Sequence, residues 1–340
     1  MRLSQLGEFG LIEAIARTTP KGSGVRIGIG DDAAWVSHPR QSSLITSDLL
    51  IEGIHFDLRW TTMFDLGYKT LAVNLSDIAA MGGISAYLML SLGIPSHFDS
   101  KKIAEFYRGI HSLAARSGVT LIGGDTNIAP LFLACACVIG HPSKHPLTRS
   151  GAKTGDDIYV TGTLGDAALA LQILQSKSKR AHGKTIGQLM QRHHRPTARL
   201  TAGSILAEKR VASAMIDISD GLIQDLGHIC KASGVGAEIS ADDIPLSSAY
   251  RAVAGKDDLR YALSGGEDYE LLFCAPHSHR DDIEKLQRRA KVSITRIGRC
   301  VASRAGISVI AASGKPIALD APGHDHFKKS ANNARRRRSA

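Results

Sequence analysis

Apolar and polar positions along the first half of the chain follow two different periods, which predicts a mixed α/β structure. Apolar residues recur at helical spacing between Phe64 and Met81, and a second helix is expected at Lys101 to Arg116. Shorter β-like runs surround these helices. They are Val25 to Ile29, Ala33 to Val36, Ser43 to Thr46, Ala86 to Leu92, Val119 to Ile122 and Leu131 to Ile139.

The second half repeats this alternation. Strands are expected at Asp157 to Val160, Ala214 to Ile218, Tyr269 to Cys274 and Val292 to Ile297. Helices are expected at Asp166 to Leu174, Ala198 to Glu208, Gly221 to Ala232 and Asp281 to Arg289. Residues 175 to 195 are expected to form an exposed connection, and the histidines in it, His182, His193 and His194, to be surface residues rather than metal ligands.

The segment Gly140 to Gly155 is rich in Pro, Gly, Lys and Ser, which indicates a domain boundary. A chain of 340 residues is long enough for two domains, each with its own core. We therefore expect an N-terminal domain of residues 1–145, a C-terminal domain of residues 146–328 and a basic disordered tail of residues 329–340. Both domains are expected to be mixed α/β.

Composition narrows the class of protein. No apolar run approaches the roughly 18 to 20 residues of a membrane span, and the N-terminal residues lack the apolar region of a signal peptide. A cytoplasmic enzyme is therefore expected. The five cysteines are odd in number and scattered, which predicts reduced, mostly buried thiols. Cys135 and Cys137 share one strand face, but no Cys or His pair with zinc-like spacing lies nearby, so a core position is favoured over a metal site.

The formal net charge of +10 is unevenly distributed. Lys328, Lys329 and the run Arg335 to Arg338 place six positive charges in the last thirteen residues. Their neighbours are polar or small, so a solvated tail is favoured over a nucleic-acid contact. The remaining chain is only mildly basic, and charge gives little support for specific nucleic-acid binding.

Seven aspartates stand beside glycine or at the ends of apolar runs. They are Asp31, Asp32, Asp48, Asp77, Asp125, Asp217 and Asp220. A buried carboxylate costs free energy unless it is paired, hydrogen-bonded or bound to a metal. Each one alone is as readily explained as a helix cap or a turn residue. As a set, with hydroxyls beside them at Thr46, Ser47, Ser76 and Thr126, they suggest a site for Mg²⁺ and phosphate.

Two glycine motifs do not support direct phosphate binding. Gly28-Ile-Gly-Asp-Asp-Ala partly matches a dinucleotide fingerprint, but its two aspartates would repel a pyrophosphate. Gly183-Lys-Thr resembles the end of a Walker A loop, but Ser178 occupies the position of the required first glycine. Any phosphate is therefore expected to be held through metal.

Two further segments carry candidate substrate contacts. Ser264-Gly-Gly-Glu-Asp-Tyr-Glu-Leu joins two glycines to acids and an aromatic residue, just before a predicted strand. Glu267 or Asp268 either orients a polar or cationic substrate or completes a turn. His55 follows the Thr-Ser-Asp segment closely enough to reach the same site, although a single histidine is more often structural.

Taken in order, these segments resemble the thiamine-monophosphate kinases, a family within the aminoimidazole ribonucleotide synthetase superfamily. The resemblance runs from about Gly7 to Phe327. It rests on Gly28-Ile-Gly-Asp-Asp-Ala-Ala, Ser47-Asp with His55-Phe, Tyr68-Lys-Thr-Leu-Ala-Val-Asn-Leu-Ser-Asp, Leu121-Ile-Gly-Gly-Asp-Thr, Thr148-Arg-Ser-Gly-Ala, Ile216-Asp-Ile-Ser-Asp-Gly-Leu, Ser264-Gly-Gly-Glu-Asp-Tyr-Glu-Leu and Asp325-His-Phe.

The resemblance implies a two-domain PurM-like fold of the α/β class, in which the N-terminal domain forms a β-barrel at a homodimer interface. It implies Mg²⁺-dependent, in-line transfer of the γ-phosphoryl group of ATP to thiamine phosphate, giving thiamine diphosphate and ADP. The acceptor phosphate is already anionic, so catalysis needs positioning and charge stabilisation and no general base.

The resemblance also implies roles for individual residues. The implied Mg²⁺ ligands are Asp32, Thr46, Ser47, Asp48, Asp77, Asp125, Asp217 and Asp220. The implied ATP contacts are Tyr107, Gly124, Asp125, Arg149 and Ser219. The implied thiamine phosphate contacts are His55, Glu267 and His324. The family usually carries an aromatic residue at the last of these positions, and the imidazole of His324 can still stack on a ring.

Other functions stay open at this point. Aminoimidazole ribonucleotide synthetase belongs to the same superfamily, although the Ser264-Gly-Gly-Glu-Asp-Tyr-Glu segment favours the kinase. Selenophosphate synthetases need a cysteine near the N-terminus, and this chain has none before Cys135. The hydrogenase-maturation relatives use a C-terminal cysteine, which is also absent. A catalytically silent nucleic-acid-binding relative would use the arginine-rich tail.

Overall fold

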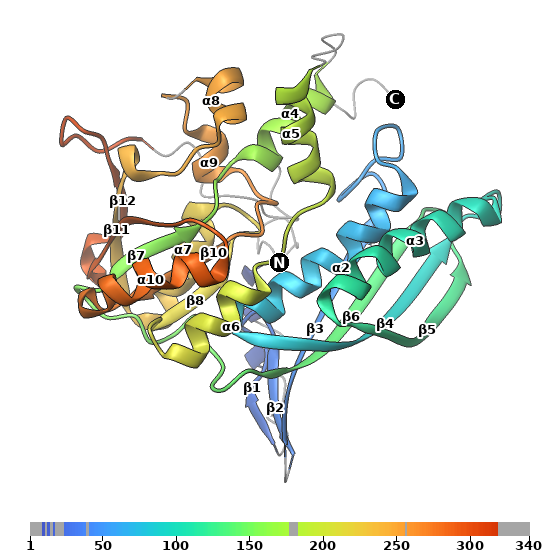
Figure 1. The fold of residues 1–340 in the computed structure, drawn as a ribbon, viewed down its shortest axis with the longest axis horizontal. Coiled ribbons are helices and arrows are strands. Elements are labelled where there is room, and N and C mark those ends of the chain that lie inside the picture. Colours follow the sequence, from blue (N-terminus) through green and yellow to red (C-terminus); the bar gives the residue numbers. More distant parts are fainter. Residues whose placement is uncertain are drawn as a thin grey trace.

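Two six-stranded sheets, one from each half of the chain, organise the computed structural model (Figure 1). The structure describes residues 9–10, 12–13, 16–17, 24–38, 41–176, 183–255 and 257–318. His324, the Asp325-His-Phe segment and the basic tail lie outside these residues, as do Lys177 to His182. No helix in the described part of the chain is long and apolar enough to cross a membrane.

The first sheet is formed by residues 25–142. Its strands are β1 (Val25–Ile27), β2 (Ala34–His38), β3 (Gln41–Ile51), β4 (Gly83–Ile94), β5 (Thr120–Ile128) and β6 (Leu133–Pro142), in the order β1-β2-β3-β6-β4-β5. Only β4 and β5 run parallel; the other neighbours are antiparallel. The sheet is open, because its edge strands β1 and β5 do not pair with each other. The described chain alone therefore forms no closed barrel.

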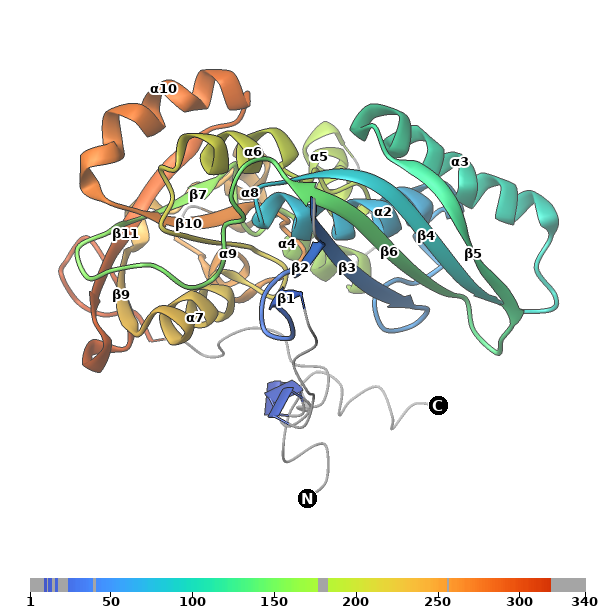
Figure 2. The ribbon, with the colours of Figure 1, turned by 90° about the horizontal axis from the view of Figure 1, so that it is seen from below.

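Two helices, α2 (Met63–Ala80) and α3 (Ser100–Ser117), cover one face of this sheet (Figure 2). Alternation along β4 directs Leu88, Leu90 and Leu92 to this covered face, and the opposite face carries Tyr87 and Met89. We call this opposite face of the first sheet the outer face. It is the side that no helix of the described chain covers.

The second sheet contains β7 (Asp157–Thr161), β8 (Ala214–Asp217), β9 (Val235–Ser240), β10 (Leu271–Ala275), β11 (Ile294–Ala302) and β12 (Ile307–Ile310), in the order β12-β9-β11-β7-β10-β8. Helices cover both of its faces. They are α4 (Asp166–Gln175), α5 (Lys184–His194), α6 (Leu200–Lys209), α7 (Leu222–Ser233), α8 (Ser248–Ala254), α9 (Arg260–Ser264) and α10 (Arg280–Ala290). Every residue of β7, β8 and β10 is buried, which explains why these strands are continuous apolar runs.

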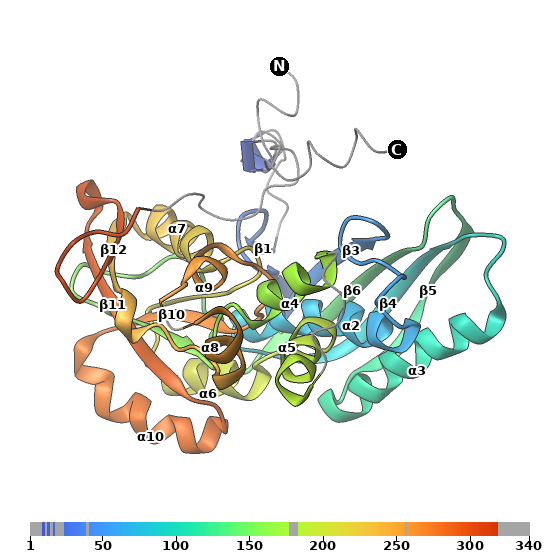
Figure 3. The same cartoon turned by 90° about the horizontal axis from the view of Figure 1, so that it is seen from above.

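Helix α2 belongs by sequence to the first half but lies between the two sheets (Figures 1 and 3). Sixteen of its eighteen residues are buried. Ala79 and Ala80, near its end, pack in one apolar cluster with Met215 of β8 and Phe273 of β10. The two halves therefore share part of their core.

The predicted mixed α/β character of both halves is confirmed, whereas the expected exposed connection at residues 175 to 195 is wrong for its described part from residue 184 to residue 194. Lys184–His194 forms helix α5, which packs beside α2 (Figure 3). His193 is only 4% exposed. The polar composition of this segment suggested a loop, but its ionic side chains are paired with buried carboxylates, described below.

Candidate active site

Three carboxylates meet between the two halves of the molecule. Asp32, Asp77 and Asp217 each offer an oxygen, and these oxygens lie within 4.8 Å of one another. Asp32 lies in the loop between β1 and β2, Asp77 in the last turn of α2, and Asp217 at the end of β8. All the donors are hard oxygens, and this is the donor set that Mg²⁺ prefers.

Hydroxyl groups hold two of these carboxylates in place. The Thr46 hydroxyl donates to Asp77 Oδ2 at 2.5 Å. The Ser76 hydroxyl donates to Asp217 Oδ2 at 2.6 Å and so links α2 to the second sheet. Asp48, two residues after Thr46 on β3, donates its backbone N–H to the Asn74 side chain of α2 at 3.1 Å. Hydrogen bonds thus join polar residues in the C-terminal half of α2 to polar residues of strand β3.

The pKa values of these acids record how much negative charge the site concentrates. Burial raises the pKa of Asp48 to about 6. Burial, followed by repulsion from Asp48, Asp217 and Asp32, raises the pKa of Asp77 well above its usual range. Asp217 is raised in pKa in the same way, by burial and by Asp32. A bound divalent cation would offset this repulsion, because it favours the ionised form of each ligand.

Arg149 is a positive side chain beside these acids. Its guanidinium lies 3.0 Å from Asp32 Oδ1 and 4.0 Å from Asp31 Oδ1. Asp31 also accepts the backbone N–H groups of Asp32 and Arg149. Asp31 thus orders the turn that presents Asp32, which agrees with a structural role for this residue.

Asp225 fixes the loop that carries Ser219 and Asp220. Its Oδ2 atom accepts three backbone N–H groups, those of Ser219, Asp220 and Gly221, at 3.0–3.1 Å. Asp225 is 2% exposed, and burial raises its pKa well above the usual range. The sequence reasoning missed this residue, although an acid in the first turn of a helix, four residues after a glycine, is a signal for such a contact.

Glu267 lies beside the first half of α2. Lys69 of α2 donates to Glu267 Oε1 at 2.6 Å, and His193 Nδ1 of α5 lies 3.0 Å from Glu267 Oε2. Lys69 and His193 were not candidates from the sequence, because nothing in a helical period marks a buried ion pair between residues 198 positions apart. Glu267 keeps 25% of its side chain exposed.

His55 has a defined tautomer in the turn after β3. Its Nδ1 atom accepts the backbone N–H of Ile51 at 3.0 Å. The proton of the neutral ring is therefore on Nε2, which makes that nitrogen a hydrogen-bond donor.

Some of the implied ligands do not join the carboxylate cluster within one chain. Ser47 and Asp125 pair in register with outer-face positions, Ser47 opposite Cys137 and Asp125 opposite Ser91. Gly124 and Asp125 lie on β5, three strand spacings from Asp48 on β3, which is about 14 Å. Tyr107 lies on α3, packed against the first core. His324 lies outside the described residues.

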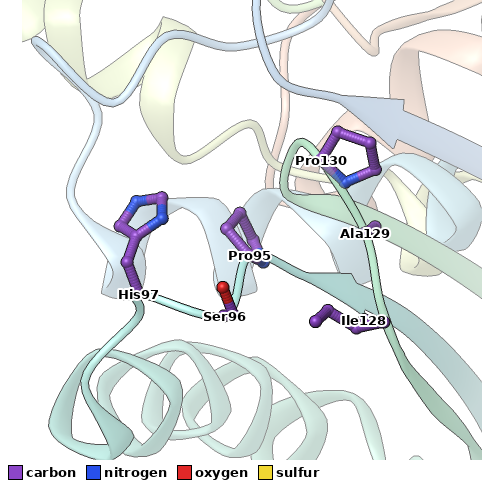
Figure 4. Close-up of a pocket in the computed structure, with 6 residues that line it drawn as sticks. All are labelled: Pro95, Ser96, His97, Ile128, Ala129 and Pro130. Atoms are coloured by element: carbon purple, nitrogen blue, oxygen red, sulfur yellow. The ribbon is translucent and has the colours of Figure 1, made fainter.

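A cavity of about 350 Å³ lies away from these acids, between the loop after β4 and the loop between β5 and β6 (Figure 4). It is lined by Pro95, Ser96, His97, Ile128, Ala129 and Pro130. No carboxylate, lysine or arginine is among these lining residues. Its lining therefore does not suit a metal or a phosphate.

Comparisons with known proteins agree with this geometry. Two family models match the chain: the N-terminal domain of AIR synthase related proteins over residues 30–141, and the C-terminal domain over residues 153–310. The thiamine-monophosphate kinase of Salmonella typhimurium is 43% identical over 324 residues, covering 94% of this chain and 98% of that protein. The chain belongs to the thiamine-monophosphate kinase family. The family resemblance inferred from the motifs is confirmed.

More distant members of the family and solved structures extend the match. The Bacillus subtilis thiamine-monophosphate kinase is 33% identical over 327 residues, covering 95% of this chain and all of that protein. A structure described as AaThiL complexed with AMPPCP and TMP has a TM-score of 0.83 at 34% identity, and covers 96% of this chain and 99% of that one. The thiamine-monophosphate kinase of Stenotrophomonas maltophilia gives a TM-score of 0.74 at 39% identity, over 90% and 96% of the two chains.

Proposed function

We propose that the protein transfers the γ-phosphoryl group of ATP to thiamine phosphate, giving thiamine diphosphate and ADP. The observation that carries the proposal is the cluster of Asp32, Asp77 and Asp217 in a chain 33–43% identical to thiamine-monophosphate kinases over nearly its whole length. A solved family member that binds AMPPCP supports ATP as the phosphoryl donor.

Mg²⁺ is the proposed cofactor. Asp32, Asp77 and Asp217 would hold it, with Thr46, Asp48 and Asp220 as further ligands on neighbouring ions. Several divalent ions are needed, because ATP and thiamine phosphate bring many negative charges to acids that already repel one another. When bound, these ions supply charge stabilisation for phosphoryl transfer.

The chain's own residues then mainly bind and orient the substrates. The acceptor oxygen of thiamine phosphate is already anionic, so no side chain has to remove a proton. Arg149 is the proposed phosphate contact, with Ser219, Gly124 and Tyr107 as further ATP contacts. The Nε2–H donor of His55 and the carboxylate of Glu267 are proposed to contact thiamine phosphate, and His324 to stack on it. Mg²⁺ held by these acids would supply charge stabilisation, and the residues named here would hold donor and acceptor in line for the transfer.

The outer face supports a homodimer. Its exposed apolar side chains, each 44–48% exposed, are Leu49, Ile84, Tyr87 and Met89. A contiguous exposed apolar surface marks an interaction site. We propose that a second copy covers it and that the two open sheets close into a β-barrel there. Ser47, Gly124 and Asp125 would then act at the interface, where the partner's cluster is within reach.

The proposed domains are residues 1–145 and 146–328, joined in Gly140 to Gly155, with residues 329–340 as a tail. Each of the two sheets falls within one of these ranges, which supports the division. The shared cluster around Ala79 means that the domains pack closely.

The proposed function is tested by incubating purified protein with ATP, thiamine phosphate and excess Mg²⁺, and by measuring thiamine diphosphate. We expect stoichiometric formation of thiamine diphosphate and ADP. Formylglycinamidine ribonucleotide in a parallel reaction tests the aminoimidazole ribonucleotide synthetase alternative. Turnover of that compound, with no thiamine diphosphate, would overturn the proposal.

Deletion of residues 330–340 tests the alternative of a nucleic-acid-binding relative that uses the arginine-rich tail. For a kinase, this deletion should leave turnover unchanged.

A further inference from the structure

Glu267 is held in an unusual backbone conformation. Its φ of +71° and the φ of +51° at Tyr269 lie in the left-handed region, which costs free energy for residues other than glycine. Backbone hydrogen bonds to the loop after β8 hold the segment: Glu267 N–H donates to Ser219 at 2.8 Å, and Tyr269 N–H donates to Ile218 at 2.8 Å. The backbone alone thus fixes where the Glu267 side chain begins.

Two buried side chains fix where it ends. Lys69 is 3% exposed and contacts one carboxylate oxygen, and His193 is 4% exposed and lies against the other. Among the described residues, the buried Nδ1 atom of His193 makes no well-aligned hydrogen bond. It lies 3.0 Å from Glu267 Oε2, so its contact is with this carboxylate. Burial alone would raise the pKa of Glu267, but Lys69 and His193 hold it well below its usual range.

The supports of Glu267 are themselves anchored. Arg192, next to His193, pairs with the fully buried Glu270, and Arg195 pairs with Asp65 in the first turn of α2. The end of α5 is thereby tied to both halves of the molecule. A turn that only closes the chain does not need this set of buried ion pairs. The Glu267 side chain that they surround remains 25% exposed and so can reach a ligand.

Helix α2 also sets the distance from Glu267 to the metal cluster. Lys69 and Ser76 are seven residues apart, so they lie on the same side of the helix. Lys69 contacts Glu267 and Ser76 contacts Asp217. At 1.5 Å per residue, the two anchor points are about 10 Å apart along the axis. A substrate that spans them has a phosphate at one end and a hydrogen-bond donor or cation at the other.

We infer that Lys69 and His193 are positioning residues that hold the Glu267 carboxylate, roughly one to two turns along α2 from the Ser76 anchor of the metal cluster, to bind the organic end of the acceptor. Each carboxylate oxygen can accept a second hydrogen bond, so Glu267 can still receive an amino group of the substrate. This inference rests on the proposed function, since it assigns Glu267 to the acceptor and not to ATP.

The experiment measures steady-state kinetics of Lys69→Met, Glu267→Gln and the double variant, with each substrate varied in turn. For Lys69→Met we expect kcat/KM for thiamine phosphate to fall at least tenfold, with KM for ATP within threefold of wild type. The double variant should be no worse than Glu267→Gln alone, because Lys69 acts only through Glu267. Lys69→Arg, which keeps the charge, should recover part of the loss. Lys101→Met, an exposed lysine on α3, is the matched control.

Three outcomes would overturn the inference: an unchanged kcat/KM for thiamine phosphate, a parallel rise in KM for ATP, or multiplicative losses in the double variant. If Lys69→Met does not fold, as judged by its melting transition, His193→Gln takes its place with the same expectations. Wild-type protein that forms no thiamine diphosphate refutes the proposed function instead, and the inference falls with it.

Discussion

At the residue scale, the site is defined by acids that are costly to bury together. Burial raises the pKa values of Asp48, Asp77 and Asp217, and repulsion from neighbouring acids raises those of Asp77 and Asp217 further. Such acids destabilise the metal-free protein once they ionise, and this is what makes them good ligands. The ionisation of these acids should therefore make the free energy of unfolding of the metal-free protein depend on pH.

We expect metal-free protein to carry a pH-dependent penalty from Asp48. Its folded pKa of about 6 exceeds the ordinary 3.8, so the folded state binds more protons, and stability falls as pH rises through about 6. In the presence of a chelator, the free energy of unfolding of Asp48→Asn should rise relative to that of wild type, by on the order of 1–3 kcal/mol, as pH is raised from 4 to 7. Urea unfolding at several pH values measures this difference.

Because both proteins contain the same other titrating groups, the contribution of those groups to the free energy of unfolding cancels in the difference between variant and wild type. His194 and His228 have pKa values lowered to about 4, chiefly by burial, so their contribution has the opposite sign: stability is lost as pH falls from about 6.5 towards 4. Excess Mg²⁺ should reverse the order and favour wild type at pH 7. Parallel pH profiles for the two proteins in chelator would contradict the prediction.

The sequence was a good guide to residues that carry a recognisable motif. Asp32, Asp77 and Asp217 were all proposed ligands, and the structure brings them together. Lys69 and Asp225 were missed, because their roles depend on partners that only the folded chain supplies. A lysine within a helical period is normally an exposed residue, and only the position of α2 between two sheets buries it.

At the scale of elements, α2 is held by unusually close backbone contacts. A Cβ atom on Gly109 of α3 would lie 2.0 Å from the Phe64 carbonyl of α2, and one on Gly203 of α6 would lie 2.1 Å from the Ala79 carbonyl. Glycine at these two positions lets α3 and α6 approach α2 from different sides. The period of the sequence predicted helix α2 well, but not these crossings, because a glycine inside a helix is read only as a weak helix former.

We expect Gly109→Ala to destabilise the protein by about 2–4 kcal/mol, since neither backbone can move away without disrupting the core. Gly187→Ala is the matched control, because Gly187 is also helical, in α5, and its added methyl group would meet nothing within 4 Å. The control should be neutral or stabilising by up to about 1 kcal/mol. Chemical denaturation of both variants tests the difference, and equal stabilities would refute the close-contact explanation.

At the scale of the whole molecule, one chain leaves the outer face open and leaves Ser47 and Asp125 on it. Periodicity predicted the strands of this sheet but could not say which face a helix would cover, because both faces of β4 carry apolar residues. The proposed homodimer would explain both the exposed apolar face and the separated ligands.

Met89→Lys should therefore produce a monomer and reduce kinase turnover at least 100-fold, because a charge buried at an interface is costly. Val253→Lys is the control: Val253 is similarly exposed at 41%, but lies on α8 in the second half. Native mass measurement and the kinase assay on both variants test this prediction. A monomeric wild type with full activity would exclude the dimer as a requirement.

The burial of α2 also has a consequence for the order in which the protein folds as it is synthesised. Residues 63–80 are made early, but their partners Glu267 and Phe273 are made about 200 residues later. At 5–20 residues per second, this helix waits roughly 10 to 40 seconds with part of its apolar and charged surface uncovered. The nascent first half is thus the species most exposed to aggregation or chaperone binding, and final folding is a late event for the whole chain.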